Sequence, residues 1–293
     1  MNSAVRDALL NDKPCENFKC DKSVIDEGYG LKAQVDDINI AYKVFGSGEP
    51  VILIIGFGGS MMNWDKTLIK ELSIRNTTII FDNRGVGHTT NGTKKSSIDQ
   101  FAKDTAGLLD AIKVKKANVL GFSMGGMIAQ ELALSYPDKV NKIILYASCC
   151  GGDESIYTAS PEVIEAFSNI SSVTCNILLR LATLMFPKKW RIENPNFMHL
   201  FDNPYSVIST NTIHNQCKAI FSWRGVCDRL NQIMKPTLII TGMEDVLVPS
   251  INSSIIAQHI TNSKTVQMSE CGHGLMYQVP QTFSSIVSTF LES

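Results

Sequence analysis

One serine of this chain lies in a setting that could make it a nucleophile. Ser123 is the centre of Gly121-Phe122-Ser123-Met124-Gly125, with the apolar Val119 and Leu120 before it and a helix-like run after it. Glycines two positions before and after a serine leave room for a sharp turn between a strand and a helix. Such a turn raises the hydroxyl above the strand ends and points the first N–H of the helix at a developing oxyanion. The pattern indicates covalent catalysis by serine.

A nucleophilic serine needs a base within hydrogen-bond reach, and that base needs an anion to fix its tautomer. Asp245 lies in the turn after an expected strand over 236–241, and His273 lies in the turn after an expected strand over 264–268. Because parallel strands end at one edge of a sheet, residues just past those ends meet there although they are far apart in the chain. The chain therefore offers a nucleophile, an acid and a base in the order Ser123, Asp245, His273.

The segments around these residues alternate between strand and helix patterns. Residues 31–45 alternate apolar and polar side chains before Gly46-Ser47-Gly48, which predicts a hairpin or meander at the start of the sheet. Aliphatic runs typical of strands buried on both faces predict a mostly parallel, doubly wound α/β sheet. These strands are expected at 51–55, 77–81, 117–121, 140–147, 236–241 and 264–268, with helices over 98–112, from 124 to about 136, and over 281–291.

Residues 151–232 interrupt this alternation. Strand patterns disappear, and helical segments are expected around 161–170, 173–186, 205–220 and 223–230. The run Asn176 to Phe186 is apolar but too short to span a bilayer, so it fits either a core helix or a lid helix over an apolar pocket. We expect an N-terminal arm over 1–30, a core over 31–150 and 233–293, and a helical cap over 151–232 inserted before the penultimate strand.

Composition excludes several classes of function. The 293 residues are 44% hydrophobic and 19% charged, which suits one large α/β domain with an insertion or two small domains. A net charge of −1 argues against a nucleic-acid surface, and no apolar run is long enough for a membrane span. Met1 to Asn11 lack the apolar run of a secretory signal, so we expect a cytoplasmic location.

The eight cysteines do not form a paired zinc pattern. A chain of this length needs no disulfide scaffold, so most of them are expected to be buried small hydrophobes. Pairing of Cys15 with Cys20 stays open.

The chain resembles an α/β-hydrolase of the serine-nucleophile, cap-bearing kind, a group that includes carboxylesterases, methylesterases, enol-lactonases and haloperoxidase-like proteins. The resemblance runs from about residue 35 to the C-terminus, apart from the cap. It rests on the Ser123 turn and on residues 56–59, 82–87, 242–249 and 272–273. One departure is that Ile55-Gly56 stands where many relatives carry His-Gly.

The resemblance implies a role for each matching residue. Ser123 would be the nucleophile, His273 the general base and Asp245 the orienting acid, while the N–H groups of Phe57 and Met124 would form the oxyanion hole. It implies no organic cofactor and no metal. The segment from Asp82 to Arg84 is expected to be scaffold that braces loops through charge-assisted bonds.

Other residues compete for two of these roles. Glu244 is the neighbour of Asp245, and Asp153 follows the preceding core strand, from which some relatives take their acid. The place of Asp245 in its turn favours Asp245. Three other histidines, His88, His214 and His259, are less well placed than His273. In the cap, His214, Trp223 and Arg224 are candidates for substrate contact.

The expected reaction is hydrolysis of a carboxylic ester or lactone through an acyl-enzyme, on a small molecule with an apolar part. A serine at position 123 argues against a dehalogenase or epoxide hydrolase, which need a carboxylate nucleophile. Carbon–carbon bond hydrolases commonly have an aromatic residue after the catalytic histidine, where this chain has Gly274. Carbon–carbon hydrolysis, perhydrolysis, acyl transfer and a ligand-binding role without turnover remain the alternatives.

Overall fold

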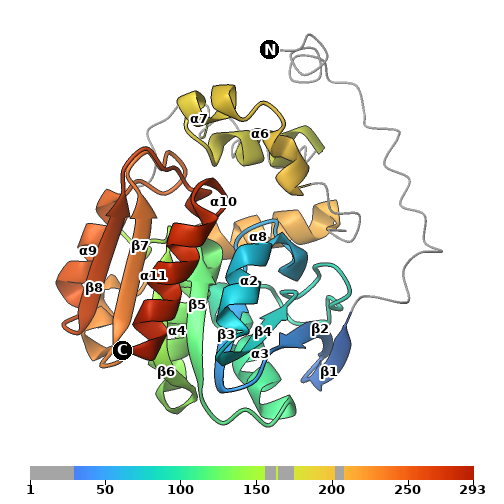
Figure 1. Cartoon of the computed structure of the whole chain (residues 1–293). Helices are drawn as coiled ribbons and strands as arrows, with labels where there is room; N and C mark the ends of the chain where they lie inside the picture. Colours follow the sequence, from blue (N-terminus) through green and yellow to red (C-terminus); the bar gives the residue numbers. More distant parts are fainter. Residues whose placement is uncertain (1–29, 156–162, 164–174, 202–207) are drawn as a thin grey trace.

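An eight-stranded sheet runs through the molecule in the order β1-β2-β4-β3-β5-β6-β7-β8 (Figure 1). The computed structural model describes residues 30–155, 163, 175–201 and 208–293, so the arm expected over 1–30 lies almost wholly outside the described residues. β2 pairs antiparallel with β1 and β4, and every other pairing is parallel. The strands are β1 (Leu31–Val35), β2 (Ile38–Phe45), β3 (Glu49–Ile54), β4 (Asn76–Phe81), β5 (Ala117–Phe122), β6 (Val140–Tyr146), β7 (Thr237–Gly242) and β8 (Ser263–Met268).

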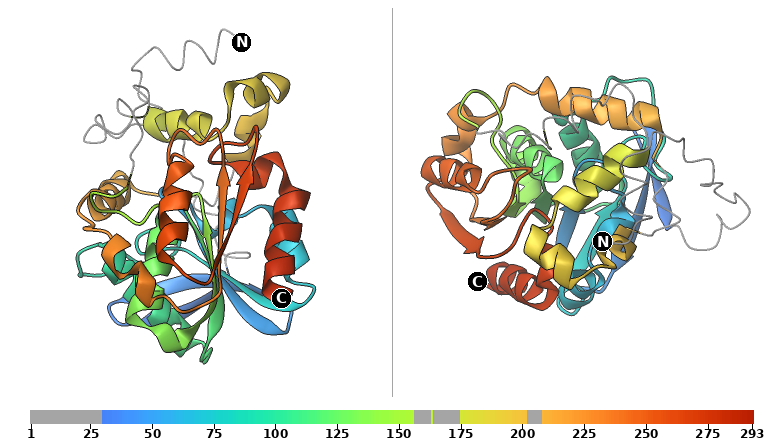
Figure 2. Two further views of the ribbon diagram at one scale, coloured as in Figure 1. Left: turned by 90° about the vertical axis from the view of Figure 1, so that its left-hand side faces the viewer. Right: turned by 90° about the horizontal axis from the view of Figure 1, so that it is seen from above.

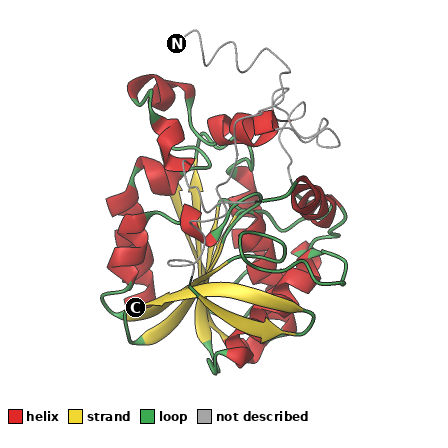
Figure 3. Cartoon of the chain, turned by 90° about the vertical axis from the view of Figure 1, so that its right-hand side faces the viewer, coloured by secondary structure: helices red, strands yellow, loops and turns green. Residues whose placement is uncertain are grey.

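Helices cover both faces of this sheet, as Figures 2 and 3 show. On one face, α3 (Ile98–Ala111), α4 (Met124–Ser135) and α9 (Ile251–His259) pack on one apolar cluster. On the other, α2 (Lys66–Leu72), α10 (Leu275–Gln278) and α11 (Pro280–Glu292) pack on a second cluster. Strands with apolar side chains on both faces need a cover on each side, which confirms the predicted doubly wound α/β class.

Between β6 and β7 the structure describes several helices with connecting segments, and Figure 1 shows α6 and α7 above the end of the sheet. We refer to residues 151–226 as the insertion. Its elements are α6 (Cys175–Leu184), α7 (Lys188–Glu193), a 3₁₀ helix over Phe197–Phe201 and α8 (Thr210–Phe221). The helix expected at 161–170 lies outside the described residues apart from position 163. None of the helices in the described ranges is long and apolar enough to cross a membrane.

A disulfide joins Cys150, at the start of the insertion, to Cys227, just after its end. Cys149, Cys217 and Cys271 are unpaired and buried, which agrees with their expected packing role. Cys15 and Cys20 lie outside the described residues.

Two local predictions were wrong. The first hairpin turns at Asp36 and Asp37 rather than at 46–48, and the segment at 46–48 instead leads to β3, which pairs with β4 and not with β2. The predicted helix over 223–230 is replaced by an irregular stretch and a 3₁₀ helix over Cys227–Gln232. Gly225 has a φ of 81° beside Gly151, and a regular helix cannot include that conformation.

Candidate active site

Ser123 occupies a strained turn between the central strand β5 and helix α4. Its φ of 54° and ψ of −116° are rare for a residue with a side chain. The backbone is fixed on both sides, because the Ser123 N–H donates to the carbonyl oxygen of Tyr146 (2.8 Å) and the Ser148 hydroxyl donates to the carbonyl oxygen of Ser123 (2.8 Å). The Ser123 side chain makes no capping bond to α4. The fold therefore presents this serine at a helix start without using its hydroxyl for structure.

The flanking glycines are required by close backbone approach. A Cβ on Gly121 would collide with the carbonyl oxygen of Gly125, and a Cβ on Gly125 would collide with the carbonyl oxygen of Ile54. A Cβ on Gly56 would come within 3.1 Å of the Ser123 Cβ. The spacing seen in the sequence is thus explained by how tightly β3, β5 and α4 meet.

His273 and Asp245 are in direct contact. Nδ1 of His273 lies 2.7 Å from Oδ2 of Asp245, and both side chains are buried. The other carboxylate oxygen, Oδ1, accepts the N–H groups of Leu247 (2.9 Å) and Val248 (2.8 Å). Three hydrogen bonds therefore fix the carboxylate, and the carboxylate fixes the orientation of the imidazole ring, which leaves Nε2 for other chemistry.

The competing residues are placed differently. Glu244 and Asp153 are exposed, and the backbone N–H of Glu244 donates to the carbonyl oxygen of Cys271 (2.8 Å). Nδ1 of His259 lies 2.9 Å from the carbonyl oxygen of Ile255 on the same helix. The N–H of His88 bonds Asp82. The structure thus brings together Asp245 and His273 and neither of the alternative acids.

The loop after β3 carries Phe57, the second expected oxyanion donor besides Met124, the first residue of α4. The N–H of Gly59 donates to the carbonyl oxygen of Gly56 (3.2 Å), which closes a tight turn around Phe57. Further along, the N–H of Met61 donates to Oδ1 of Asp82 (2.8 Å). Burial of the Asp82 carboxyl raises its pKa to about 6, although the hydrogen bonds from the backbone N–H groups of Met61 and His88 act to lower it. The bond from Met61 to Asp82 joins the loop after β3 to the loop after β4, which is the bracing role expected of Asp82.

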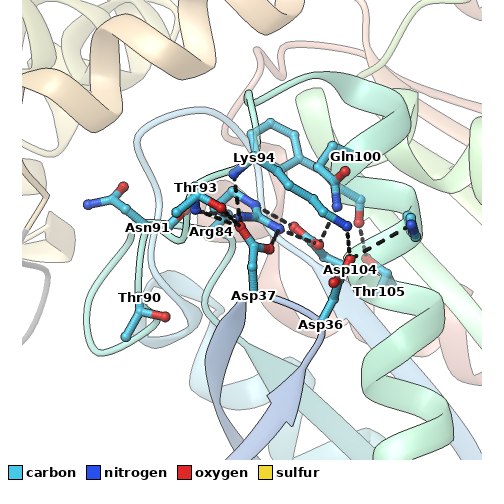
Figure 4. A network of polar contacts seen from close by, with 12 residues as sticks. Asp36, Asp37, Arg84, Thr90, Asn91, Thr93, Lys94, Gln100, Asp104 and Thr105 are labelled. Atoms are coloured by element: carbon cyan, nitrogen blue, oxygen red, sulfur yellow. Dashed lines mark hydrogen bonds and ion pairs between the residues drawn. The ribbon is translucent and has the colours of Figure 1, made fainter.

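Arg84 ties the next loop to the core (Figure 4). Its guanidinium donates to both oxygens of Asp104 (2.7 and 2.8 Å) and to both oxygens of Asp37 (2.9 and 3.0 Å). The hydrogen bonds from Arg84 hold the pKa of Asp37 well below its usual range. Bidentate pairing of this kind fixes geometry as well as charge, so the loop is anchored to β1–β2 and α3 at once.

The insertion packs against the loop that carries His273. The carbonyl oxygen of Met185 accepts the N–H of Gly274 (2.8 Å), and a Cβ on Gly274 would lie only 2.5 Å from the Phe186 ring. Phe186 also belongs to an aromatic cluster with stacked and edge-on contacts; the other members are Trp190, Phe197, Phe201 and Tyr277. The sequence carried no local signal for the contacts of Met185 and Phe186 with Gly274 and Tyr277, because they join residues about 90 positions apart.

Trp223 and Arg224 line a cleft with Ser97 and Glu131, and neither His273 nor Asp245 belongs to its lining. The Trp223 Nε1–H donates to Glu131 Oε1 (2.9 Å). Within the described ranges, no group of three or more His, Cys, Asp or Glu side chains is arranged to hold a metal ion.

Comparison with known proteins adds a family and several relatives. The model of a family described as the alpha/beta hydrolase fold matches residues 49–168. A protein of Azorhizobium caulinodans, named provisionally as the carbamate hydrolase RutD, is 27% identical over 261 residues, covering 87% of this chain and 95% of that protein. The 3-oxoadipate enol-lactonase 2 of Acinetobacter baylyi is 24% identical over 259 residues, covering 87% and 94%.

A solved structure shares the whole architecture. The enol-lactonase from Burkholderia xenovorans LB400 superposes with a TM-score of 0.79 at 21% identity, covering 90% of this chain and all of that one. At this identity the likeness concerns the fold, and it extends across the sheet and the helices on both faces.

Proposed function

The chain belongs to the α/β-hydrolase fold family, and we propose that it is a serine hydrolase that cleaves carboxylic esters or lactones through an acyl-enzyme. The observation that carries the proposal is the 2.7 Å contact between His273 Nδ1 and buried Asp245, together with the strained turn at Ser123. A fixed imidazole and a serine hydroxyl unused by the fold are the two parts that nucleophilic acyl transfer requires.

In the proposed mechanism, Ser123 Oγ attacks the scissile carbonyl carbon while Nε2 of His273 takes the hydroxyl proton. The N–H groups of Phe57 and Met124 hold the oxyanion of the tetrahedral intermediate. When the intermediate collapses, His273 returns the proton to the leaving alcohol and the acyl group stays on Ser123. Water then attacks the acyl-enzyme with His273 as base. Asp245 remains ionised and stabilises the imidazolium at both steps.

The substrate class follows from the insertion, which we propose acts as a cap. Its aromatic cluster around Phe186 packs against the loop that carries His273, so the proposed cap brings apolar surface close to the base. Apolar surface of this kind favours an ester or lactone with an apolar part. Relatives named as an enol-lactonase and a carbamate hydrolase also cleave an acyl carbon bonded to a heteroatom, which supports this choice.

One observation weighs against the carbon–carbon alternative. The space beside Gly274 is filled by the ring of Phe186, so there is no room for an aromatic side chain directly after His273. The proposal therefore keeps acyl–oxygen cleavage as the reaction.

The test compares wild type with Ser123→Ala on p-nitrophenyl esters of increasing acyl length, with a carbamate and a lactone in the same series. Ser135→Ala, at an exposed position of α4, is the matched control. Loss of the nucleophile is expected to lower kcat by about 10⁴-fold or more, with Ser135→Ala unchanged. Equal rates in wild type and Ser123→Ala, together with no labelling of Ser123 by a fluorophosphonate, would refute the serine mechanism.

A further inference from the structure

A glutamine of the insertion is hydrogen-bonded to the loop expected to form the oxyanion hole. Gln216 lies on α8 and is completely buried. Its Oε1 accepts the N–H of Gly58 (2.9 Å), a residue 158 positions earlier in the chain. Gly58 directly follows Phe57, whose N–H is the expected oxyanion donor. One side chain of the insertion thus contacts the backbone beside the proposed catalytic machinery.

The bond controls the turn in which Phe57 sits. Gly56 to Gly59 form a tight turn closed by the Gly59 N–H, and Gly58 has a φ of 67°, as the third residue of a type II turn requires. In such a turn the N–H of the third residue is not used by the turn itself. Gln216 accepts this N–H and so holds the peptide plane between Phe57 and Gly58. That plane adjoins, through the Cα of Phe57, the peptide plane that carries the Phe57 N–H.

The other end of the same amide, Nε2, is buried and makes no hydrogen bond with a described residue. An unpaired buried amide N–H₂ is unfavourable, so a glutamine here is a poor choice if its task is only to stabilise the packing of α8. The contact with Gly58 is what this side chain provides.

A second hydrogen bond from α8 to the core offers a comparison. One turn before Gln216, the hydroxyl of Thr212 donates to the carbonyl oxygen of Gly85 (3.0 Å). Thr212 is also buried and also joins the insertion to a core loop, but that loop does not carry Phe57. Gln216 thus bonds the loop that carries Phe57, whereas Thr212 bonds the loop that carries Gly85.

We propose that Gln216 is a positioning residue for the oxyanion hole, and that through it the insertion sets the direction of the Phe57 N–H. The proposal rests on the proposed function, because it presumes that Ser123 forms tetrahedral intermediates. It assigns to α8 a part in the chemical step.

The experiment uses Gln216→Met, which keeps the length and removes the acceptor, and Gln216→Glu, which keeps an acceptor oxygen. A carboxyl group buried at this position is expected to be neutral, so the glutamate adds no charge. Thr212→Val is the matched control. For each protein we would measure kcat and KM on one p-nitrophenyl ester, the inhibition constant of an arylboronic acid, and the thermal midpoint. The boronic acid forms a tetrahedral adduct on the serine and so tests the oxyanion hole without turnover.

We expect Gln216→Met to lower kcat by about 10- to 100-fold with KM within about two-fold. A Phe57 N–H that points away from the oxyanion loses much of its stabilisation of the transition state, although less than a deleted donor would. Boronic acid inhibition should weaken by a similar factor. Gln216→Glu should recover most of both losses. Thr212→Val should lower the thermal midpoint and leave kcat unchanged.

Two results would overturn the inference while leaving the proposed function intact. In the first, Gln216→Met matches Thr212→Val in kcat and in boronic acid inhibition. In the second, Gln216→Glu is as impaired as Gln216→Met. If wild type neither cleaves any ester in the series nor binds the boronic acid, the proposed function fails and the inference fails with it.

Discussion

The hydroxyl of Tyr146 donates to the backbone carbonyl oxygen of His273 across 2.5 Å. The carbonyl oxygen of the same Tyr146 accepts the N–H of Ser123, so one residue of β6 holds the backbone of both the proposed nucleophile and the proposed base. Tyr146 is completely buried and stacks on Phe122, with ring centroids 4.5 Å apart. Burial raises the pKa of its hydroxyl well above the ordinary value, so it stays a donor. The placement of Ser123 relative to His273 therefore depends in part on this one residue, through its backbone carbonyl and its hydroxyl.

Tyr146→Phe keeps the ring and removes only this hydroxyl. We expect kcat for ester hydrolysis to fall by about 10-fold with little change in KM, because the backbone of His273 loses its anchor and catalysis depends on sub-ångström placement. Tyr277→Phe removes the hydroxyl of a half-buried tyrosine, which donates to the carbonyl oxygen of Asn63 instead, and is the control. Steady-state kinetics on both variants would decide, and an equal loss of kcat in the two would contradict the assignment.

Two variants can distinguish Asp245 from its neighbour Glu244 as the acid that orients His273. Asp245→Asn should lower kcat by about 10⁴-fold, because an amide in place of the carboxylate favours the wrong tautomer of His273. Glu244→Gln, on the exposed neighbouring residue, should stay close to wild type. Measuring kcat/KM for the two variants on the same ester tests this. The reverse order of effects would move the acid to Glu244.

Gly274 and Phe186 should behave as a coupled pair. Gly274→Ala introduces a Cβ 2.5 to 3.1 Å from three atoms of the Phe186 ring, so we expect a loss of stability of about 1 to 3 kcal/mol, as for an overpacked core. In the Phe186→Leu background, which relieves the crowding, the same glycine substitution should cost clearly less. Chemical denaturation of the four proteins of this cycle measures the coupling. Additive effects would show that the ring does not restrict position 274.

Asp82 should make stability depend on pH in a predictable direction. Its folded-state pKa of about 6 exceeds the ordinary 3.8, so between these values the folded protein binds more protons than the unfolded chain. Stability contributed by the neutral form is therefore complete below about pH 4 and is lost as the pH rises to about 6. Relative to Asp82→Asn, which does not titrate, wild type should lose about 2 to 3 kcal/mol across this range. A stability difference that stays constant from pH 4 to 7 would contradict the raised pKa.

The layered sheet could be predicted because its strands are defined by local sequence. The run 51–55 is apolar at successive positions, and a strand covered on both faces accommodates that pattern. The meeting of Asp245 and His273 was also expected, since both follow the ends of parallel strands, and the structure places them 2.7 Å apart. Their catalytic roles, with those of Ser123, Phe57 and Met124, stay predictions.

Other features depend on contacts that no local pattern encodes. The first turn uses Asp36 at a φ of 50°, a conformation that sequence reasoning assigns to glycine, so the hairpin was misplaced. Helix α9 was missed because its polar and apolar residues show little helical periodicity. Gln216 and Tyr146 act through bonds to residues more than 120 positions away, and nothing near either residue in the chain indicates the partner.

The disulfide between Cys150 and Cys227 has a consequence for how this chain could be altered. The two Cα atoms lie 5.2 Å apart, little more than the 3.8 Å between neighbouring residues, so the insertion begins and ends at almost the same point. A foreign segment whose ends are equally close could be grafted at these two positions without moving the chain on either side. Such a graft would also remove Gln216 and its bond to Gly58, so the new segment would have to supply an acceptor for that N–H.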